Sequence, residues 1–345
     1  MILLAAQAAP DSHVYVSVAA EKRIAVFVAD GDDGQLRHLQ DAACEAEPGA
    51  LAVSPDGRVL VAALRSSGQL SSFRRDPQTG KLTPVNTVAA GDDPAQLSLD
   101  GSGRFVFTAY YVAAKVTVHA LDREGKLSAE PLQSIPTADK AHAIVLEKGG
   151  RHAFVSHTGS DVIFQFRWDG AKQRLSPGDP LRLTTRPGTG PRHIVFHPRL
   201  PLAYVSNEQA NSVTAYRFDP KSGTLKAEQT VPSLPEGFDG RNATAEIRIH
   251  PSGKQLFCAN RGHDSLARYS VDDEGRLKFL GTTPTEKTPR SFDIDPAGKF
   301  LYAAGESSGK LVCYRIDEER GDLKPAKAIE VGPKLWWVLC APVGR

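Results

Sequence analysis

The stretch "TGPRHIVFHPRLPLAYVSNEQ", residues 189–209, contains two runs of alternating apolar residues separated by a short turn. Arg192 and His193 precede the first run, and Asn207 and Glu208 end the second. Apolar–polar alternation over about four to eight positions, bounded by Gly and Pro, is typical of half-buried antiparallel strands. The stretch is therefore predicted to form a β-hairpin whose open end carries charged side chains.

The same unit recurs along the chain as an apolar strand, a turn such as SPDG, a second apolar strand, a polar loop, a third strand and a G-x-L sequence. Clear copies are "LAVSPDGRVLVAALRSSGQLSSFRRDPQTGKL", "IRIHPSGKQLFCANRGHDSLARYSVDDEGRL" and "FDIDPAGKFLYAAGESSGKLVCYRIDEERGDL". The turn recurs about every 45 to 53 residues, a spacing typical of propeller blades. Its positions are Pro55, Gly101, Lys148, Pro198, Pro251, Pro296 and Pro342.

The two ends of the chain carry incomplete units that complement each other. The first unit, "HVYVSVAAEKRIAVFVADGDDGQLRHLQ", lacks an opening strand, and the C-terminal "KLWWVLCAP" is an opening strand with nothing after it. Joining them completes one blade and removes the exposed sheet edges of an open ring. We predict an all-β, seven-bladed β-propeller, closed by the C-terminal strand, as a single domain over residues 13–345. Residues 1–12 are predicted to be a disordered or processed segment.

The amino-acid composition of the chain argues against several classes of binding partner. The chain has 345 residues, with 42 basic against 40 acidic ones, which argues against a broad nucleic-acid-binding face. No apolar run approaches the ~18 residues of a membrane span. The four cysteines are widely spaced without a CxxC pair, which argues against a zinc or redox motif. We therefore expect no nucleic-acid or membrane partner, and a monomer or weak homo-oligomer. The start "MILLAAQAAPDSH" fits either a cytoplasmic protein or a short or truncated export signal.

The hairpin repeat predicts which residues share one face of the disk. The innermost strand of a blade runs along the channel and the second strand returns beside it. Residues just before the first strand and just after the second must therefore meet at one channel mouth. Before the first strand come Gln96, His142, Arg192, His193, Glu246, Arg290, Trp336 and Trp337, and after the second come Arg65, Tyr111, His157, Glu208, Arg261 and Glu306.

Arginines converging with His and Glu suit an anionic, oxygen-rich ligand, because guanidinium groups bind carboxylate or phosphate in a fork. A His or Glu beside them can take a proton from water, and an Arg can stabilise an oxyanion. The chain contains no GxSxG or HExxH sequence. Hydrolase or lyase chemistry without a metal or another cofactor is therefore expected. The alternative is that these charges only pair with one another to hold the blades together.

The blocks "GPRHIVFHP...AYVSNE", "AEIRIHPSGKQLFCANRG" and "TPRSFDIDPAGKFLYAAGE" resemble the seven-bladed propeller lactonase family. That family contains propeller-type 6-phosphogluconolactonases and carboxy-cis,cis-muconate lactonising enzymes. The resemblance runs from about residue 13 to the end, although "LEKGGRH" replaces the usual turn in the fourth blade. It implies hydrolysis of 6-phospho-D-glucono-1,5-lactone, a step of the pentose phosphate pathway. It also implies an active site formed by His142, Arg192, Glu208 and Arg261.

The residues predicted to be catalytic are thus His142, Arg192, Glu208 and Arg261, and those predicted to bind a small anionic lactone are His193, Arg290 and Glu246. Glu208 or His142 is expected to be the general base. The arginines are expected to hold the anionic group or the carbonyl oxygen. Two alternatives stay open. One is cycloisomerisation of a carboxymuconate or hydrolysis of another sugar lactone, and the other is a non-catalytic propeller that binds a protein partner.

Overall fold

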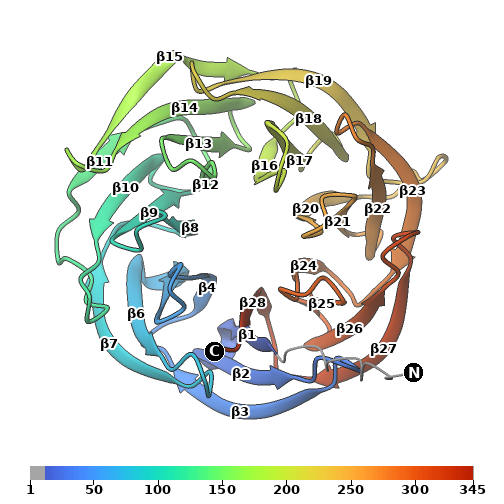
Figure 1. Ribbon diagram of the computed structural model, residues 1–345, viewed down its shortest axis with the longest axis horizontal. Coiled ribbons are helices and arrows are strands. Elements are labelled where there is room, and N and C mark those ends of the chain that lie inside the picture. The colour runs from blue at the N-terminus through green and yellow to red at the C-terminus, as the bar shows by residue number, and fades with distance from the viewer. Residues whose placement is uncertain (1–11, 345) are drawn as a thin grey trace, which may run out of the picture.

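The computed structural model describes residues 12–344. Within this range the strands form seven four-stranded antiparallel sheets, arranged as blades around a common axis (Figure 1). Two short 3-10 helices, η1 (Ala19–Glu21) and η2 (Arg65–Ser67), are the helical elements of this part of the chain, and no helix in it is long and apolar enough to cross a bilayer. The predicted all-β, seven-bladed propeller is confirmed.

In each blade the four strands follow one another in order from the central axis to the outer edge. Blade 1 consists of β28 (Leu335–Pro342), β1 (Ser12–Val18), β2 (Arg23–Ala29) and β3 (Leu36–Ala43). Blade 2 consists of β4 (Pro48–Val53), β5 (Val59–Leu64), β6 (Gln69–Arg75) and β7 (Leu82–Ala89). Blade 3 consists of β8 (Pro94–Leu99), β9 (Phe105–Tyr110), β10 (Lys115–Ala120) and β11 (Gln133–Pro136).

The remaining blades follow in the same order around the ring. Blade 4 consists of β12 (Ala141–Leu146), β13 (His152–His157), β14 (Val162–Asp169) and β15 (Arg174–Thr184). Blade 5 consists of β16 (Pro191–Phe196), β17 (Leu202–Asn207), β18 (Ser212–Asp219) and β19 (Thr224–Pro232). Blade 6 consists of β20 (Ala243–Ile249), β21 (Gln255–Arg261), β22 (Ser265–Val271) and β23 (Leu277–Pro284), and blade 7 of β24 (Pro289–Ile294), β25 (Phe300–Gly305), β26 (Lys310–Ile316) and β27 (Leu323–Glu330).

The predicted closure of the ring by the C-terminal strand is also confirmed. Strand β28 pairs antiparallel with β1, from Pro342 opposite Ser12 to Leu335 opposite Val18 (Figure 1). Strand β1 begins one residue before the predicted start of the domain. The rest of the predicted N-terminal segment, residues 1–11, lies outside the described residues.

The blades pack face to face through their middle strands. Every residue of β5, β9, β13, β17 and β25 is buried, because both faces of these strands are covered by a neighbouring blade. On the face opposite the charged mouth, histidines in the hairpin turns bond to the next blade. His197 Nε2 lies 3.1 Å from the Gly253 carbonyl oxygen, and His250 Nε2 lies 2.7 Å from that of Gly298. The scaffold around the axis is thus held by apolar packing and by the turns of its far face.

The unusual fourth turn is intact despite its sequence. The Glu147 carboxylate accepts hydrogen bonds from the backbone N–H groups of Gly149 and Arg151, the latter at 2.8 Å. In the seventh blade the Asp295 carboxylate accepts bonds from its own turn in the same way. The fourth hairpin therefore keeps the register that brings His142 to the mouth.

A β-bulge interrupts each inner strand where it reaches the charged mouth. The pairing of β12 with β13 skips from Ala141 to Ala143, which leaves His142 unpaired, and β16 skips from Pro191 to Ile194. Corresponding shifts occur in β4, β8, β20, β24 and β28. An extra residue in one strand turns its side chain out of the ordinary alternation. The bulges therefore present His142, Arg192, His193, Arg290 and Trp336 to the mouth from four different blades.

Candidate active site

The bulged ends of the inner strands line a small pocket at the mouth. Its lining consists of Gly49, Ala50, Arg65, Ala95, His142, Arg192, His193, Arg290, Trp336 and Trp337. The pocket measures about 270 Å³ with its opening to solvent included. Side chains nearly fill it, and a sugar-sized ligand must rest on its open side, against the groups that line it.

Arg192 connects this pocket to two predicted residues outside its lining. Arg192 Nε lies 2.8 Å from Glu208 Oε2, and Arg261 Nη2 lies 3.3 Å from the same oxygen. The Arg192 side chain is only 2% exposed, and its Nη1 has no hydrogen-bond partner among residues 12–344. A buried donor without a partner is costly, so its presence at a pocket indicates a place where a ligand oxygen completes the hydrogen bonding.

Electrostatics fix the charge states of this ion-paired group. Burial, with Arg261 and Arg290 nearby, lowers the pKa of Arg192 to about 9, so the side chain stays protonated at neutral pH. Burial raises the pKa of Glu208, but Arg192, Arg261 and Arg290 outweigh this and hold it below its usual value. Glu208 is therefore ionised and a weaker base than an ordinary glutamate.

His142 and His193 form a pair of imidazoles beside Arg192. Their ring centroids are 4.9 Å apart, and both side chains are almost fully buried. Burial, followed by the charge of Arg192, lowers the pKa of each well below its normal value. His142 Nδ1 has no hydrogen-bond partner within the described part of the chain. Both rings are thus neutral at physiological pH, which is the form that can accept a proton.

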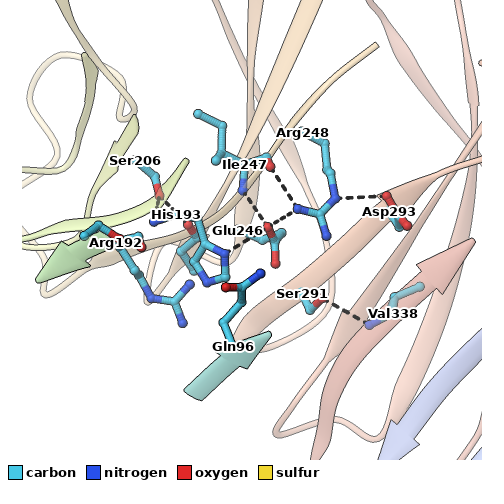
Figure 2. A network of polar contacts seen from close by, with 12 residues as sticks. Gln96, Arg192, His193, Ser206, Glu246, Ile247, Arg248, Ser291, Asp293 and Val338 are labelled. Atoms are coloured by element: carbon cyan, nitrogen blue, oxygen red, sulfur yellow. Dashed lines mark hydrogen bonds and ion pairs between the residues drawn. The ribbon is translucent and has the colours of Figure 1, made fainter. Parts of the chain in front are cut away.

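Glu246 lies directly behind His193, and Figure 2 shows it between that ring and Arg248. His193 Nδ1 lies 3.4 Å from Glu246 Oε1, and Arg248 Nη1 pairs with the same oxygen. Arg248 Nε donates in turn to Asp293 Oδ1 at 2.9 Å. Glu246 is 0% exposed, and burial raises its pKa. The carboxylate predicted to bind substrate is therefore covered by His193.

Arg65, Trp336 and Arg290 occupy the other side of the mouth, on blades 2, 1 and 7. Arg65 pairs through two bonds with Asp93, Nε to Oδ1 at 2.6 Å and Nη2 to Oδ2 at 2.8 Å. Arg290 Nη1 lies 3.4 Å from Glu306 Oε2, whose other oxygen accepts a bond from Trp336 Nε1 at 3.0 Å. Charged groups from neighbouring blades therefore surround one indole ring.

Most of the predicted residues meet at this mouth. His142, Arg192, His193 and Arg290 line the pocket, while Glu208 and Arg261 lie beside it through Arg192. The expectation for His157 was wrong, since its ring is fully buried within its blade, 4.8 Å from that of Phe164. Arg248 and Asp293 were missed. Arg248 stands two residues after Glu246, a spacing that places both on one face of a strand and could have indicated the pair.

The described residues do not gather three or more His, Cys, Asp or Glu side chains in a way that could hold a metal ion. What the mouth offers instead is two neutral imidazoles, a buried arginine with a free donor, and further arginines around the opening. Such a group can take a proton from water and stabilise an oxyanion next to a bound anion.

Comparisons with known proteins agree with this geometry. The family model described as "Lactonase, 7-bladed beta-propeller" matches residues 5–91 and 83–340. A 6-phosphogluconolactonase of Pectobacterium carotovorum subsp. carotovorum is 34% identical over 326 residues, which cover 94% of this chain and 97% of the relative. A 6-phosphogluconolactonase of Klebsiella pneumoniae is 32% identical over 331 residues, covering 94% and 98%.

A solved structure extends the similarity to the whole ring. The periplasmic gluconolactonase of Pseudomonas aeruginosa superposes with a TM-score of 0.89 at 26% identity, covering 97% of this chain and 100% of that one. The name of this Pseudomonas protein refers to a lactone without a phosphate, whereas the names of the two sequence relatives refer to a phosphorylated one.

Proposed function

Because the chain belongs to the seven-bladed β-propeller lactonase family, we propose that it hydrolyses 6-phospho-D-glucono-1,5-lactone to 6-phosphogluconate at the pocket described above. The observation that carries the proposal is the buried Arg192 Nη1, which has no partner among residues 12–344 and lies beside two neutral imidazoles. A lactone carbonyl oxygen fits this donor, and it gains negative charge when water attacks. The phosphate group of the proposed substrate is inferred from the relatives, which are named 6-phosphogluconolactonases.

The proposed reaction needs no group beyond the chain, the lactone and water. A neutral imidazole of the His142–His193 pair takes a proton from water as the water oxygen bonds to the lactone carbon. The carbonyl oxygen becomes an oxyanion held by Arg192. The intermediate then collapses, the bond from this carbon to the ring oxygen breaks, and the imidazolium returns the proton to that oxygen. The product is an open-chain acid, which ionises.

Glu208 is proposed to position the two arginines rather than to act as the base. Its carboxylate is ion-paired with Arg192 and Arg261, which lower its pKa and hence its basicity. The proton is instead proposed to be taken up by the His142–His193 pair, which includes His142, the alternative predicted base. Arg261 is proposed to hold Glu208 and to add positive charge to the mouth.

Glu246 is proposed to orient His193 instead of contacting substrate. A carboxylate behind one ring nitrogen fixes the tautomer and directs the other nitrogen toward the reacting atoms, as in hydrolases with a His–Asp pair. Burial raises the pKa of Glu246, while Arg248, itself paired with Asp293, favours the ionised form of this carboxylate. Glu246, Arg248 and Asp293 thus pair with one another beneath the pocket.

We also propose a cytoplasmic location and a monomer or weak homo-oligomer. A phosphorylated lactone is doubly charged and does not cross a bilayer unaided, so its hydrolase belongs where the sugar phosphate is made. The formal net charge of +2 gives no broad attraction for nucleic acid. Only Val112 and Leu132 are large exposed hydrophobic residues within the described range, which leaves no extended apolar face for a permanent partner.

The proposed function is tested by a substrate panel with the full-length protein. We expect hydrolysis of freshly generated 6-phosphogluconolactone well above its spontaneous rate, with weaker activity on gluconolactone. Activity on a carboxymuconate lactone alone would redirect the assignment to the cycloisomerase branch. A rate equal to the spontaneous one on every lactone tested would reject the proposal and favour a binding propeller.

A further inference from the structure

The side of the mouth opposite the histidine pair concentrates positive charge around one aromatic ring. Arg290 Cζ lies 5.7 Å from the centroid of the Trp336 ring, Arg65 Cζ lies 5.8 Å from it, and Lys334 Nζ lies 6.0 Å from it. These residues belong to blades 7, 1 and 2, which are consecutive around the ring, with Lys334 just before β28. By contrast, His142, Arg192 and Arg261 belong to blades 4, 5 and 6.

The cations around Trp336 are close enough to repel one another. After burial, the charge of Arg65 is the largest influence that lowers the pKa of Arg290. Asp93 accepts bonds from Nε and Nη2 of Arg65 and leaves its Nη1 without an acidic partner within the described residues. Arg290 makes a single 3.4 Å contact with Glu306 through Nη1. Like charges held together at a pocket are stabilised by an anion that bridges them.

Between the two sides the pocket wall is made of small residues. The bulges of blades 2 and 3 present Gly49, Ala50 and Ala95, whereas blades 1, 4, 5 and 7 present large side chains. A Cβ at Gly49 would lie 2.9 Å from Cγ and Cδ of Arg65, so glycine lets the arginine side chain lie across this wall. The body of a ligand could therefore rest here with one end toward each charged side.

We infer that Arg65, Arg290 and Trp336 form a subsite for a phosphomonoester, which holds the 6-phosphate of the substrate while its carbonyl meets Arg192 and the histidine pair across the pocket. The inference rests on the proposed function and adds Arg65 and Trp336 to its residues. The two guanidinium groups bind the phosphate oxygens. The indole ring keeps them oriented toward the opening.

This division of the mouth links substrate recognition to catalysis. Arg65 and Arg290 are among the charges that lower the pKa of His142. A phosphate dianion placed between them offsets part of that effect and makes the imidazole a stronger base. A phosphorylated lactone should thus be favoured in turnover as well as in binding.

The test compares kcat/KM for 6-phosphogluconolactone with kcat/KM for gluconolactone. In Arg65→Gln this ratio should fall about 10- to 100-fold, the effect expected for losing a charge-assisted pair with phosphate. The ratio for Arg65→Lys should lie between those of wild type and Arg65→Gln, because lysine keeps the positive charge but lacks the forked guanidinium group. Arg74→Gln, an exposed arginine of β6 outside the pocket lining, is the matched control and should keep the wild-type ratio.

Gly49→Ala is a second test of the phosphate subsite, and it changes no charged residue. The added methyl group displaces Arg65 and should lower the same ratio, with inorganic phosphate inhibiting this variant and Arg65→Gln more weakly than wild type. If wild type prefers the phosphorylated lactone while Arg65→Gln and Gly49→Ala keep its ratio, the subsite is wrong and the lactonase assignment stands. If wild type hydrolyses neither lactone, the proposed function itself fails.

Discussion

Arg192 and Glu208 form an ion pair at 2.8 Å in which the arginine is almost completely buried and the glutamate is one-quarter exposed. The pair comes from the bulged start of one strand and the residue after its neighbour in the same blade. Breaking a buried pair leaves an uncompensated charge, so each partner depends on the other for its position. The position of Arg192 in the candidate site is therefore set by the hairpin that carries both residues.

Replacing Glu208 by Gln separates its positioning role from a role as base. We expect kcat/KM for the phosphorylated lactone to fall about 10- to 100-fold, mainly through kcat, because Arg192, the proposed oxyanion donor, loses the carboxylate that aligns it. The measurement is a steady-state pH–rate profile, with Glu228→Gln on the outer surface as the control. A loss in kcat above about 1,000-fold, with disappearance of the acid limb, would identify Glu208 as the base.

Glu246→Gln tests the orientation of His193. The variant should lower kcat at least about tenfold with little change in KM, since the residue does not reach substrate. Removing the carboxylate also disfavours the imidazolium form of His193, so the acid limb of the kcat profile should move to lower pH. A purely structural role would leave the position of that limb unchanged. Thermal unfolding of the variant checks that the fold is intact although Arg248 has lost the Glu246 carboxylate and pairs only with Asp293.

Buried neutral histidines make the fold sensitive to acid. Burial lowers the pKa of His119 and of His157 to about 4, whereas the unfolded chain titrates near 6.5. Above about pH 6.5 their stabilising contribution is complete, and it is lost as the pH falls toward 4, because the unfolded state takes up protons first. We expect roughly 2 kcal/mol per imidazole to be lost between about pH 7.5 and pH 5, measured by urea unfolding. A free energy of unfolding that does not change over this range contradicts the prediction.

Removal of β28 tests the closure of the ring. A chain ending at Lys334 lacks the innermost strand of blade 1 and exposes the edge of β1, which pairs with β28 along its whole length. The truncated protein should be insoluble or lack a cooperative thermal transition. A chain ending at Pro342, which keeps the strand, serves as the control. A folded monomer ending at Lys334 would show that closure is dispensable.

The sequence predicted the architecture because every blade repeats one hairpin, and the turns and alternating runs of that hairpin are local signals. It also predicted the mouth residues, since the chain direction places strand ends of all blades on one face. The error at His157 is one of register. His157 ends its strand as Asn207 ends its own, and both side chains are buried within their blades. The mouth residues Arg65, Glu208 and Glu306 each follow their strand by one residue, so the equivalent position in blade 4 is Thr158.

The bulges explain the other differences between the predicted and the observed site. A bulge is set by how two strands pair, so simple alternation could not place His193 in front of Glu246. Arg65 and Trp336 were among the predicted mouth residues, but their approach across blades 1 and 2 depends on the space left by Gly49. Arg248 and Asp293 lie on the inner strands of the neighbouring blades 6 and 7, so their contact follows from how the two blades pack and not from the pattern within one blade.

Arg192 and the histidine pair are proposed to form a lactone-hydrolysing site at one end of the propeller. The most direct test of this proposal is the rate of 6-phosphogluconolactone hydrolysis, corrected for the spontaneous reaction, in wild type and in Arg192→Ala, with both proteins shown to be folded. We predict that wild type is active and that Arg192→Ala loses about 100- to 1,000-fold in kcat/KM, as for removal of an oxyanion donor. A folded Arg192→Ala protein that hydrolyses the lactone at the wild-type rate would show that Arg192 does not stabilise the oxyanion and that the reaction takes place elsewhere.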